Sequence, residues 1–104
     1  MPGNMNNLMK QAQKMQKQMA ETTKALEEKT YEATAGGGVV SVTVSGKKEV
    51  TAIKIAEEVV DPDDIEMLED LIMAATNEAF RAMESDSQAQ LSKLTGGLGG
   101  GFGF

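Results

Sequence analysis

In the first thirty residues, apolar positions recur among polar ones with the period of an amphipathic helix. Apolar or small side chains recur at intervals of three and four residues, the heptad spacing of a helix that packs along one narrow seam. Gln, Lys, Met, Ala and Glu, which fill most of the segment, all favour helix. The pattern predicts a helix over about 5–28, roughly 36 Å long at the standard rise per residue. Its seam consists of Met5, Leu8, Ala12, Met15, Met19, Thr22 and Leu26.

The pattern changes over residues 30–56 to a period of two and a high content of β-branched residues, which indicates strands. A run of three glycines and a GKKE turn separate three such segments. We predict a three-stranded antiparallel meander with Ile53 and Ile55 directed inward from its last strand. On the middle strand Val40, Val42 and Val44 share one face. The predicted strands cover about 30–35, 39–45 and 50–56.

The helical period returns after the acidic sequence DPDD. Asp61 suits the N-cap, Pro62 the first helical position, and Asp64 the acidic position of a capping box. We predict a second helix over about 62–84 that covers one side of the sheet. The residues after it either continue the helix or form a short separate one, and the glycines of 95–104 indicate a flexible tail. The expected fold is α+β, with helix, three strands and helix in one domain over 1–94. The apolar face of the second helix comprises Ile65, Leu68, Leu71, Ile72, Ala75, Ala79 and Met83.

Charge is strongly segregated along the chain. The formal net charge is −6 over 104 residues. Residues 1–26 nevertheless carry four lysines and one glutamate, whereas residues 57–90 carry eleven acidic residues against Arg81 alone. Such asymmetry is a better guide to partners than the net charge.

The composition removes several classes of function. Cys, His and Trp are absent, so disulfides, thiolate metal ligands and the commonest general base are unavailable. The acidic run around 57–70 contains a proline and lacks the glycine of a calcium loop, and the glycine runs lack a phosphate-loop context. We therefore expect no catalysis, metal, cofactor or small-molecule substrate. No apolar run reaches the ~18 residues of a membrane span, and the amino terminus does not resemble a signal peptide, which favours a cytoplasmic protein.

The lysines of the first helix form a stripe on the side away from the seam. With Met5 at heptad position a, Lys10, Lys17 and Lys24 fall at f, and Lys14 at c lies beside them. No acidic residue interrupts the stripe before Glu21, although a solvated helix usually mixes Glu with Lys. Cations spaced along a helix suit the phosphates of a nucleic-acid backbone, which carry little sequence information. A merely solubilising face is the alternative, and a membrane surface fits less well because the seam is narrow and has no aromatic anchor.

Four segments, in order along nearly the whole chain, carry a family resemblance: NMNNLMKQAQKMQKQM, GGGVVSVTVSG, VVDPDDIEMLEDLIMAATNEA and KLTGGLGG. Together they resemble the YbaB/EbfC family of bacterial nucleoid-associated proteins. The resemblance implies an α-β-β-β-α protomer and an intertwined homodimer whose long first helices project from a core of sheets and second helices. It also implies binding of duplex DNA with low or modest sequence preference, residence in the nucleoid and effects on its organisation and on gene expression. Recombination or replication proteins are further implied partners.

The resemblance implies DNA-contacting and packing roles for individual residues of this chain. Lys10, Lys14 and Lys17 lie in the matched first-helix segment and are expected to contact phosphates, with Lys24 continuing their stripe. The turn lysines Lys47 and Lys48 lie outside the strongest match and are weaker candidates. The residues expected to pack the core and the dimer are Leu68, Leu71, Ile72 and Ala75.

The acidic second helix departs from a simple DNA-binding pattern, because its charge would repel DNA and restrict it to one face of the protein. A function of another class therefore stays open. An acidic dimeric adaptor could bind partner proteins through the Met-rich seam, since methionine surfaces adapt to varied partners.

Overall fold

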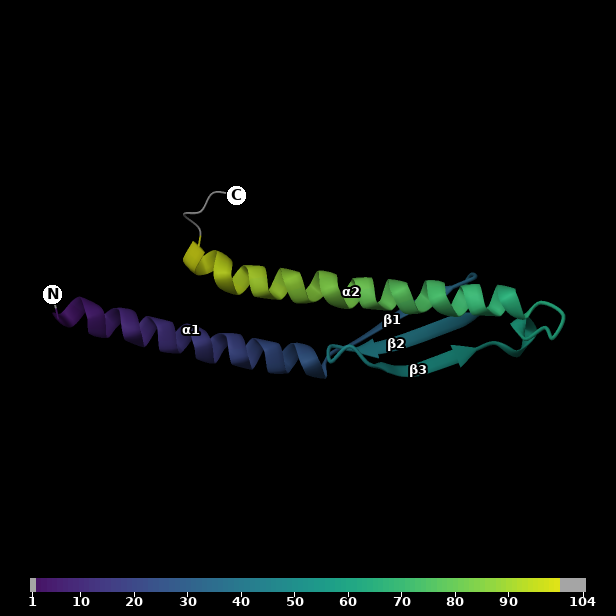
Figure 1. Cartoon of the computed structure of the whole chain (residues 1–104), viewed down its shortest axis with the longest axis horizontal. Coiled ribbons are helices and arrows are strands. Elements are labelled where there is room, and N and C mark those ends of the chain that lie inside the picture. The colour runs from purple at the N-terminus through teal and green to yellow at the C-terminus, as the bar shows by residue number, and fades with distance from the viewer. Residues whose placement is uncertain (1, 100–104) are drawn as a thin grey trace.

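The protein consists of two long helices and a small sheet between them in sequence (Figure 1). We describe a computed structural model, which defines the backbone of residues 2–99 and the side chains of residues 5–94. The order of elements confirms the predicted α+β fold. The elements are α1 (Pro2–Glu28), β1 (Thr30–Ala35), β2 (Val40–Ser45), β3 (Val50–Ile55), the short helix η1 (Glu57–Val59) and α2 (Ile65–Gly99).

The sheet is an antiparallel meander in the order β1-β2-β3, as the sequence predicts. Gly36, Gly37 and Gly38 connect β1 to β2 with φ angles of 64°, 76° and 99°, a region that favours glycine. In the turn between β2 and β3, the Ser45 amide donates a hydrogen bond of 2.8 Å to the Glu49 carbonyl. The middle strand, β2, pairs with β1 along one edge and with β3 along the other.

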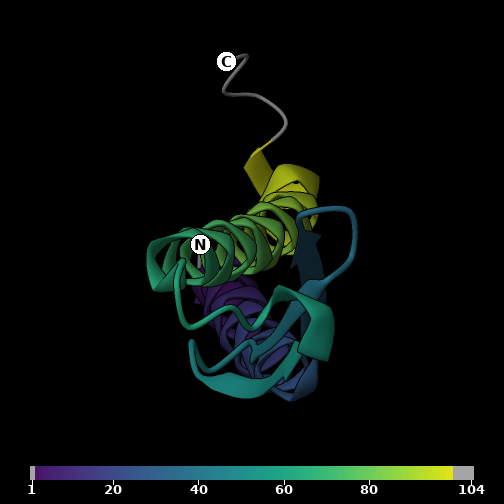
Figure 2. The ribbon, with the colours of Figure 1, turned by 90° about the vertical axis from the view of Figure 1, so that its right-hand side faces the viewer.

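The core lies between α2 and the first two strands. Val40, Val42 and Val44 of β2 are fully buried on one face, as predicted. They pack with three small or flexible residues spaced four apart along α2, namely Ala75, Ala79 and Met83. Seen along the long axis, β3 lies farther from α2 than β1 does (Figure 2). The helix therefore covers β1 and β2 and leaves β3 at the side.

Ile53 and Ile55 are directed toward the core face of the sheet, as predicted, but α2 does not cover them in the single chain. Ile53 is the cross-strand partner of Val42, and Ile55 that of Val40, so both lie on the face of the sheet that carries the core. They are nevertheless 47% and 38% exposed, because α2 packs over β1 and β2 and does not cover the third strand.

The second helix begins later than predicted, and the segment after residue 84 continues it, which is one of the two alternatives that the sequence left open. Asp61 does not cap it but forms a turn, in which its carboxylate accepts a hydrogen bond of 2.9 Å from the Asp63 amide. Asp64 precedes the helix, and its Oδ1 accepts from the Met67 amide at 3.3 Å, which is an N-cap contact. The helix then continues through Gly99 instead of ending near residue 84, because Ala, Gln, Leu and Lys beyond Met83 sustain it. The backbone of residues 95–99 therefore belongs to this helix. The flexibility of the tail over 95–104 stays a prediction, and residues 100–104 lie outside the described part of the chain.

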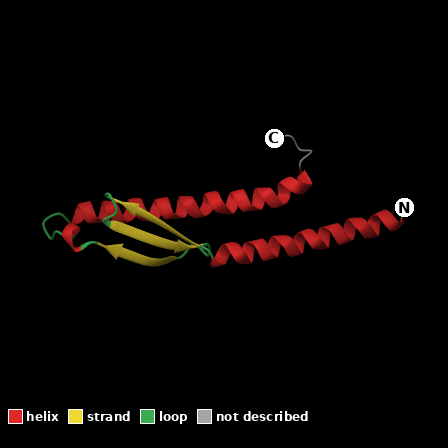
Figure 3. Cartoon of the chain, turned by 180° about the vertical axis from the view of Figure 1, so that it is seen from behind, coloured by secondary structure: helices red, strands yellow, loops and turns green. Residues whose placement is uncertain are grey.

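α1 and the carboxyl-terminal part of α2 project beyond the same end of the sheet, whereas the first part of α2 lies along the sheet (Figures 1 and 3). The molecule measures 75 × 26 × 16 Å, and its radius of gyration is 20.5 Å, against roughly 13 Å for a compact chain of this length. Of the side chains described on α1, only Leu26 is buried. Most of α1 thus leaves the body of the protein.

Candidate nucleic-acid interface

The carboxyl end of α1 is fixed to the turn between β2 and β3. Leu26 is 6% exposed, and the Gly46 amide donates a hydrogen bond of 3.0 Å to the Lys29 carbonyl. A Cβ atom added to Gly46 would lie 1.8 Å from the Leu26 carbonyl oxygen. The backbone of the turn therefore approaches the helix end more closely than any residue other than glycine allows.

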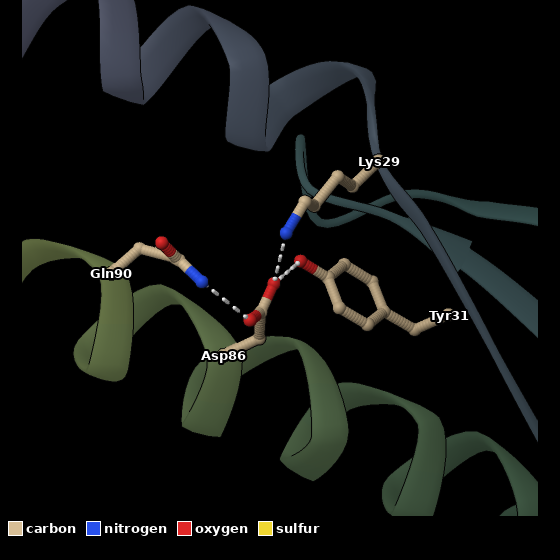
Figure 4. Close-up of polar contacts among 4 residues, drawn as sticks. All are labelled: Lys29, Tyr31, Asp86 and Gln90. Atoms are coloured by element: carbon tan, nitrogen blue, oxygen red, sulfur yellow. Dashed lines mark hydrogen bonds and ion pairs between the residues drawn. The ribbon is translucent and has the colours of Figure 1, made fainter.

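A second attachment joins the base of α1 to α2 through Asp86 (Figure 4). The Tyr31 hydroxyl donates to Asp86 Oδ2 at 2.6 Å, and Lys29 Nζ lies 3.0 Å from the same oxygen. Gln90, one turn further along α2, donates to Asp86 Oδ1 at 3.4 Å. Lys29 follows α1 directly and Tyr31 belongs to β1, so one carboxylate connects three elements.

This cluster shifts two pKa values in opposite directions. Burial, together with the hydrogen bond to Asp86 and its negative charge, raises the pKa of Tyr31 to about 12. The hydrogen bonds from Tyr31 and Lys29 lower the pKa of Asp86 to about 2. Asp86 is therefore ionised at neutral pH, and Tyr31 keeps its proton and acts as a donor.

The four stripe lysines of the sequence lie on the projecting helix. Lys10, Lys14, Lys17 and Lys24 are all exposed; the first three lie where α1 has left the body of the protein, and Lys24 lies near its attached end. An extended chain of phosphates can reach such a helix without contacting the sheet. The arrangement suits point-charge contacts along a backbone rather than a pocket.

The fold adds the turn lysines to this region. Lys47 and Lys48 are exposed and directly follow Gly46, which touches Leu26 at the end of α1. Leu26 comes two residues after Lys24. The two weaker candidates thus lie beside the base of the helix that carries the stripe, although they are more than twenty residues away in sequence.

The acidic charge is concentrated at the other end of the long axis. Eight acidic residues and no basic residue occur between positions 57 and 70. This segment contains η1 and the start of α2, which lie at the end of the molecule opposite to the amino end of α1 (Figure 1). A polyanion is therefore attracted to one end of the molecule and repelled from the other.

The four predicted packing residues lie on the sheet side of α2. Ala75 is fully buried in the core, and Leu68, Leu71 and Ile72 are half-buried and pack against it. A Cβ atom added to Gly36 would lie 3.0 Å from Leu71 Cδ2, so this leucine also lies close to the turn between β1 and β2. Within one chain these residues serve the core.

Sequence reasoning missed the cluster around Asp86. Tyr31 and Asp86 are 55 residues apart, and the segment that contains Asp86 was not assigned to a single helix. The isolated tyrosine on the first strand was the only hint, since a half-buried Tyr hydroxyl usually finds a partner.

The described residues provide no evidence for other kinds of site. Between residues 5 and 94 there is no group of three acidic, His or Cys side chains placed to hold a metal ion. Neither α1 nor α2, over its described length, is long and apolar enough to cross a membrane.

Comparison with known proteins supports the assignment that the residues suggested. A nucleoid-associated protein of Agathobacter rectalis is 73% identical over 97% of this chain and 89% of its own length. One of Lachnoclostridium phytofermentans is 70% identical over 99% of this chain and 88% of its own.

The fold also occurs in a solved structure. The crystal structure of an uncharacterized protein from Helicobacter pylori matches 86% of this chain and 94% of that one with a TM-score of 0.73, at 22% identity. This match concerns the fold alone. The YbaB/EbfC DNA-binding family matches residues 1–98, and with 98 of 104 residues covered the chain belongs to that family.

Proposed function

We propose that this protein is a nucleoid-associated homodimer that binds duplex DNA through phosphate contacts from α1. The observation that carries the proposal is the position of Lys10, Lys14, Lys17 and Lys24, all exposed on a helix that leaves the body of the protein. Lys47 and Lys48 extend the basic region at its base. Contacts of this kind bind any sequence with similar strength, which fits low sequence preference and a role in organising the nucleoid.

The charge distribution supports this choice of surface. DNA that approaches the acidic segment 57–70 meets repulsion, whereas α1 has three lysines before its first acidic residue, Glu21. Binding through α1 therefore keeps the acidic end away from the duplex. Effects on gene expression would follow from occupancy of DNA and need no base-specific contact.

The homodimer is supported by the apolar surface beside α2. Val50, Ile53 and Ile55 are 43%, 47% and 38% exposed. They lie on the face of the sheet that carries the core, since they pair with Val44, Val42 and Val40. Fully burying an exposed side chain of this kind stabilises a protein by about 1.5–3 kcal/mol, and because these three are already more than half buried, covering the rest contributes about half of that or less for each. Exposed apolar patches also mark interaction sites. A second copy placed over this strip would complete the core.

One observation favours a second candidate, an adaptor that binds other proteins. Met5, Leu8 and Met9 of α1 are between 59% and 67% exposed, and methionine-rich surfaces accommodate varied partners. Recombination or replication proteins, which the family resemblance implies, are the first partners to test. Such binding would be nearly independent of salt.

Salt dependence separates the two candidates. We would measure fluorescence anisotropy of a labelled duplex over a series of salt concentrations. If four lysines on each of two copies contact phosphates, the logarithm of affinity should fall against that of salt with a slope of about −7. Removing Lys10, Lys14 and Lys17 together by substitution with Gln should make the slope shallower by about 5.

The control changes charge elsewhere on the protein. Lys54→Gln/Lys93→Gln removes two exposed lysines from β3 and α2 and should leave the slope unchanged, whereas Lys10→Gln/Lys17→Gln, with the same loss of charge, should reduce it by about 3 to 4. Equal slopes in the two double variants, or no binding at low salt, would refute the proposed interface.

A further inference from the structure

The projecting helix α1 is held to the body of the protein mainly at its carboxyl end. Among the described side chains before Leu26, Met15 and Thr22 are half-buried and the others are exposed, whereas Leu26 is buried. Lys10 lies sixteen residues before Leu26, so a tilt of about 10° at the base would move Lys10 by roughly 4 Å at the standard rise of a helix. Contacts at the base therefore decide where the lysines of α1 lie.

Asp86 of α2 makes such a contact, beside the point at which α1 leaves the body (Figure 4). Its Oδ2 atom accepts a hydrogen bond of 2.6 Å from the Tyr31 hydroxyl and one of 3.0 Å from Lys29 Nζ. The Tyr31 side chain packs against the core, whereas Lys29 directly follows α1 and its side chain is 47% exposed. Asp86 thus ties the residue that follows α1 to a side chain that the core holds in place.

Hydrogen bonds suit this task better than apolar contacts do. A hydrogen bond has a preferred distance and angle, whereas apolar packing is not directional. An ionised acceptor such as Asp86 also makes shorter and stronger hydrogen bonds than a neutral one. Because an exposed ion pair such as that of Lys29 contributes little to stability, we assign this contact a role in the direction of α1.

We propose that Asp86 is a positioning residue for DNA binding. By holding Lys29 and Tyr31 on one carboxylate, it fixes the direction in which α1 leaves the body, and with it the positions of the stripe lysines. A helix that is already fixed in its binding direction loses less conformational freedom when it meets DNA. The effect on DNA rests on the proposed function, whereas the direction of α1 is a property of the free protein.

A pair of spin labels measures the direction of α1 without DNA. The chain has no cysteine, so Gln13→Cys on α1 and Thr34→Cys on β1, both at exposed positions, supply the two labelling sites. Refolding labelled chain with an excess of cysteine-free chain leaves one labelled copy in each labelled dimer. We expect Asp86→Ala to broaden the distribution of distances between the labels at least about twofold, because one attachment at the base is lost.

Three further variants separate the direction of α1 from charge and from stability. Glu84→Ala removes an exposed carboxylate from the same helix and should keep the wild-type width. Asp86→Asn keeps an oxygen that can accept from Tyr31 but loses the charge that attracts Lys29, so it should give an intermediate width. Tyr31→Phe keeps the ring and every charge, and it should broaden the distribution even if Asp86→Ala fails to fold.

DNA binding should change in the direction opposite to simple electrostatics. Loss of a negative charge strengthens the attraction to a polyanion, so Glu84→Ala should bind a labelled duplex as tightly as wild type or more tightly. Asp86→Ala loses the same charge, yet it should bind about three- to tenfold more weakly, because α1 must then be ordered on binding. The slope of log affinity against log salt should stay unchanged, because the same lysines make the contacts.

Two results would overturn the inference and leave the proposed function intact. One is a distance distribution in Asp86→Ala and Tyr31→Phe as narrow as that of wild type. The other is a broader distribution in Asp86→Ala together with DNA binding as tight as that of Glu84→Ala, because the direction of α1 would then not matter to binding. If wild type bound no DNA, the proposed function and the role of Asp86 in DNA binding would both fall, while the distances would still show whether Asp86 fixes α1.

Discussion

Val42 and Ile53 are cross-strand partners on the same face of the sheet, yet Val42 is fully buried and Ile53 is 47% exposed. The difference arises because α2 packs over β1 and β2 but does not cover β3. An apolar side chain aligned with the core and left uncovered indicates that one chain supplies only part of its own hydrophobic cover. The strip that contains Ile53 is the surface on which we place the second copy.

Ile53→Asp should weaken the proposed homodimer. The substitution replaces an apolar side chain by a charge at the proposed interface, and it does so once in each copy. We expect the dissociation constant to rise by at least about a hundredfold, measured by analytical ultracentrifugation. Ala52→Asp places the same charge on the opposite face of β3, because Ala52 pairs with Thr43, and should leave association nearly unchanged. Similar effects of the two variants would argue against an interface on this face.

The hydrophobic pattern predicts the face of the sheet on which a side chain lies better than it predicts whether that side chain is buried. Alternation along β2 and β3 placed Val42 and Ile53 on the same face, which the structure confirms. It did not show which strands α2 covers, because the part of the sheet that a helix packs against is set by tertiary packing and not by the period of the sequence. The start of α2 was misplaced for a similar reason, since several aspartates in DPDD can cap and only tertiary structure selects Asp64.

The residues of the candidate site also fall into two groups, those that the sequence pattern predicts and those that only the tertiary structure brings together. The stripe of Lys10, Lys14 and Lys17 follows from spacing alone, because helical geometry fixes which residues share a side. The position of Lys47 and Lys48 beside the end of α1 depends on a contact between distant segments, through Gly46 and Leu26. No local pattern encodes such a contact.

Tyr31 should titrate at unusually high pH. It is the only tyrosine of a chain without tryptophan, so ultraviolet absorbance reports on this hydroxyl alone. We expect a midpoint near pH 12 in the folded protein, compared with an ordinary pKa of 10.0. In Asp86→Asn the midpoint should fall but stay above 10.0, because burial, the largest cause of the shift, remains. An unchanged midpoint in Asp86→Asn would show that the carboxylate does not hold the hydroxyl.

The same contact makes stability depend on pH at both extremes. The pKa of Tyr31 is raised on folding, so its contribution is complete below pH 10.0 and is lost as pH rises toward 12. The pKa of Asp86 is lowered on folding from 3.8 to about 2, so its contribution is complete above pH 3.8 and is lost as pH falls toward 2. Urea unfolding should therefore show wild type and Asp86→Asn converging in stability between pH 3.8 and 2. Glu84→Gln, which removes an exposed carboxylate from the same helix, is the control for loss of one negative charge. A gap between wild type and Asp86→Asn that stays constant over this range would contradict the prediction.

Gly46→Ala should loosen the base of α1. The added Cβ would lie 1.8 Å from the Leu26 carbonyl oxygen, so the turn or the helix end must move. We expect a loss of about 1–3 kcal/mol in the free energy of unfolding, and faster hydrogen exchange of the amides of Lys29 and Gly46. Gly37→Ala is the comparison, because its Cβ meets nothing within 4 Å and only the φ angle of 76° is unfavourable. It should cost about 1–2 kcal/mol without changing exchange at Lys29. Altered exchange at Lys29 in both variants would mean that the contact between Gly46 and Leu26 is not what fixes the helix.

Lys47→Gln/Lys48→Gln decides whether the DNA surface extends from α1 onto the turn. Each phosphate contact adds about 0.9 to the slope of log affinity against log salt. If both turn lysines bind phosphates in both copies, removing them should make the slope shallower by about 3 to 4, as Lys10→Gln/Lys17→Gln does. If the slope stays at the wild-type value while affinity falls by less than about twofold, the turn lies outside the interface and only α1 contacts DNA.

The left-handed φ of 67° at Lys48 makes Lys48→Gly a useful third variant, because it removes the charge while relieving the backbone. A loss of slope in Lys48→Gly as well as in the Gln variants would assign the effect to charge and not to the shape of the turn.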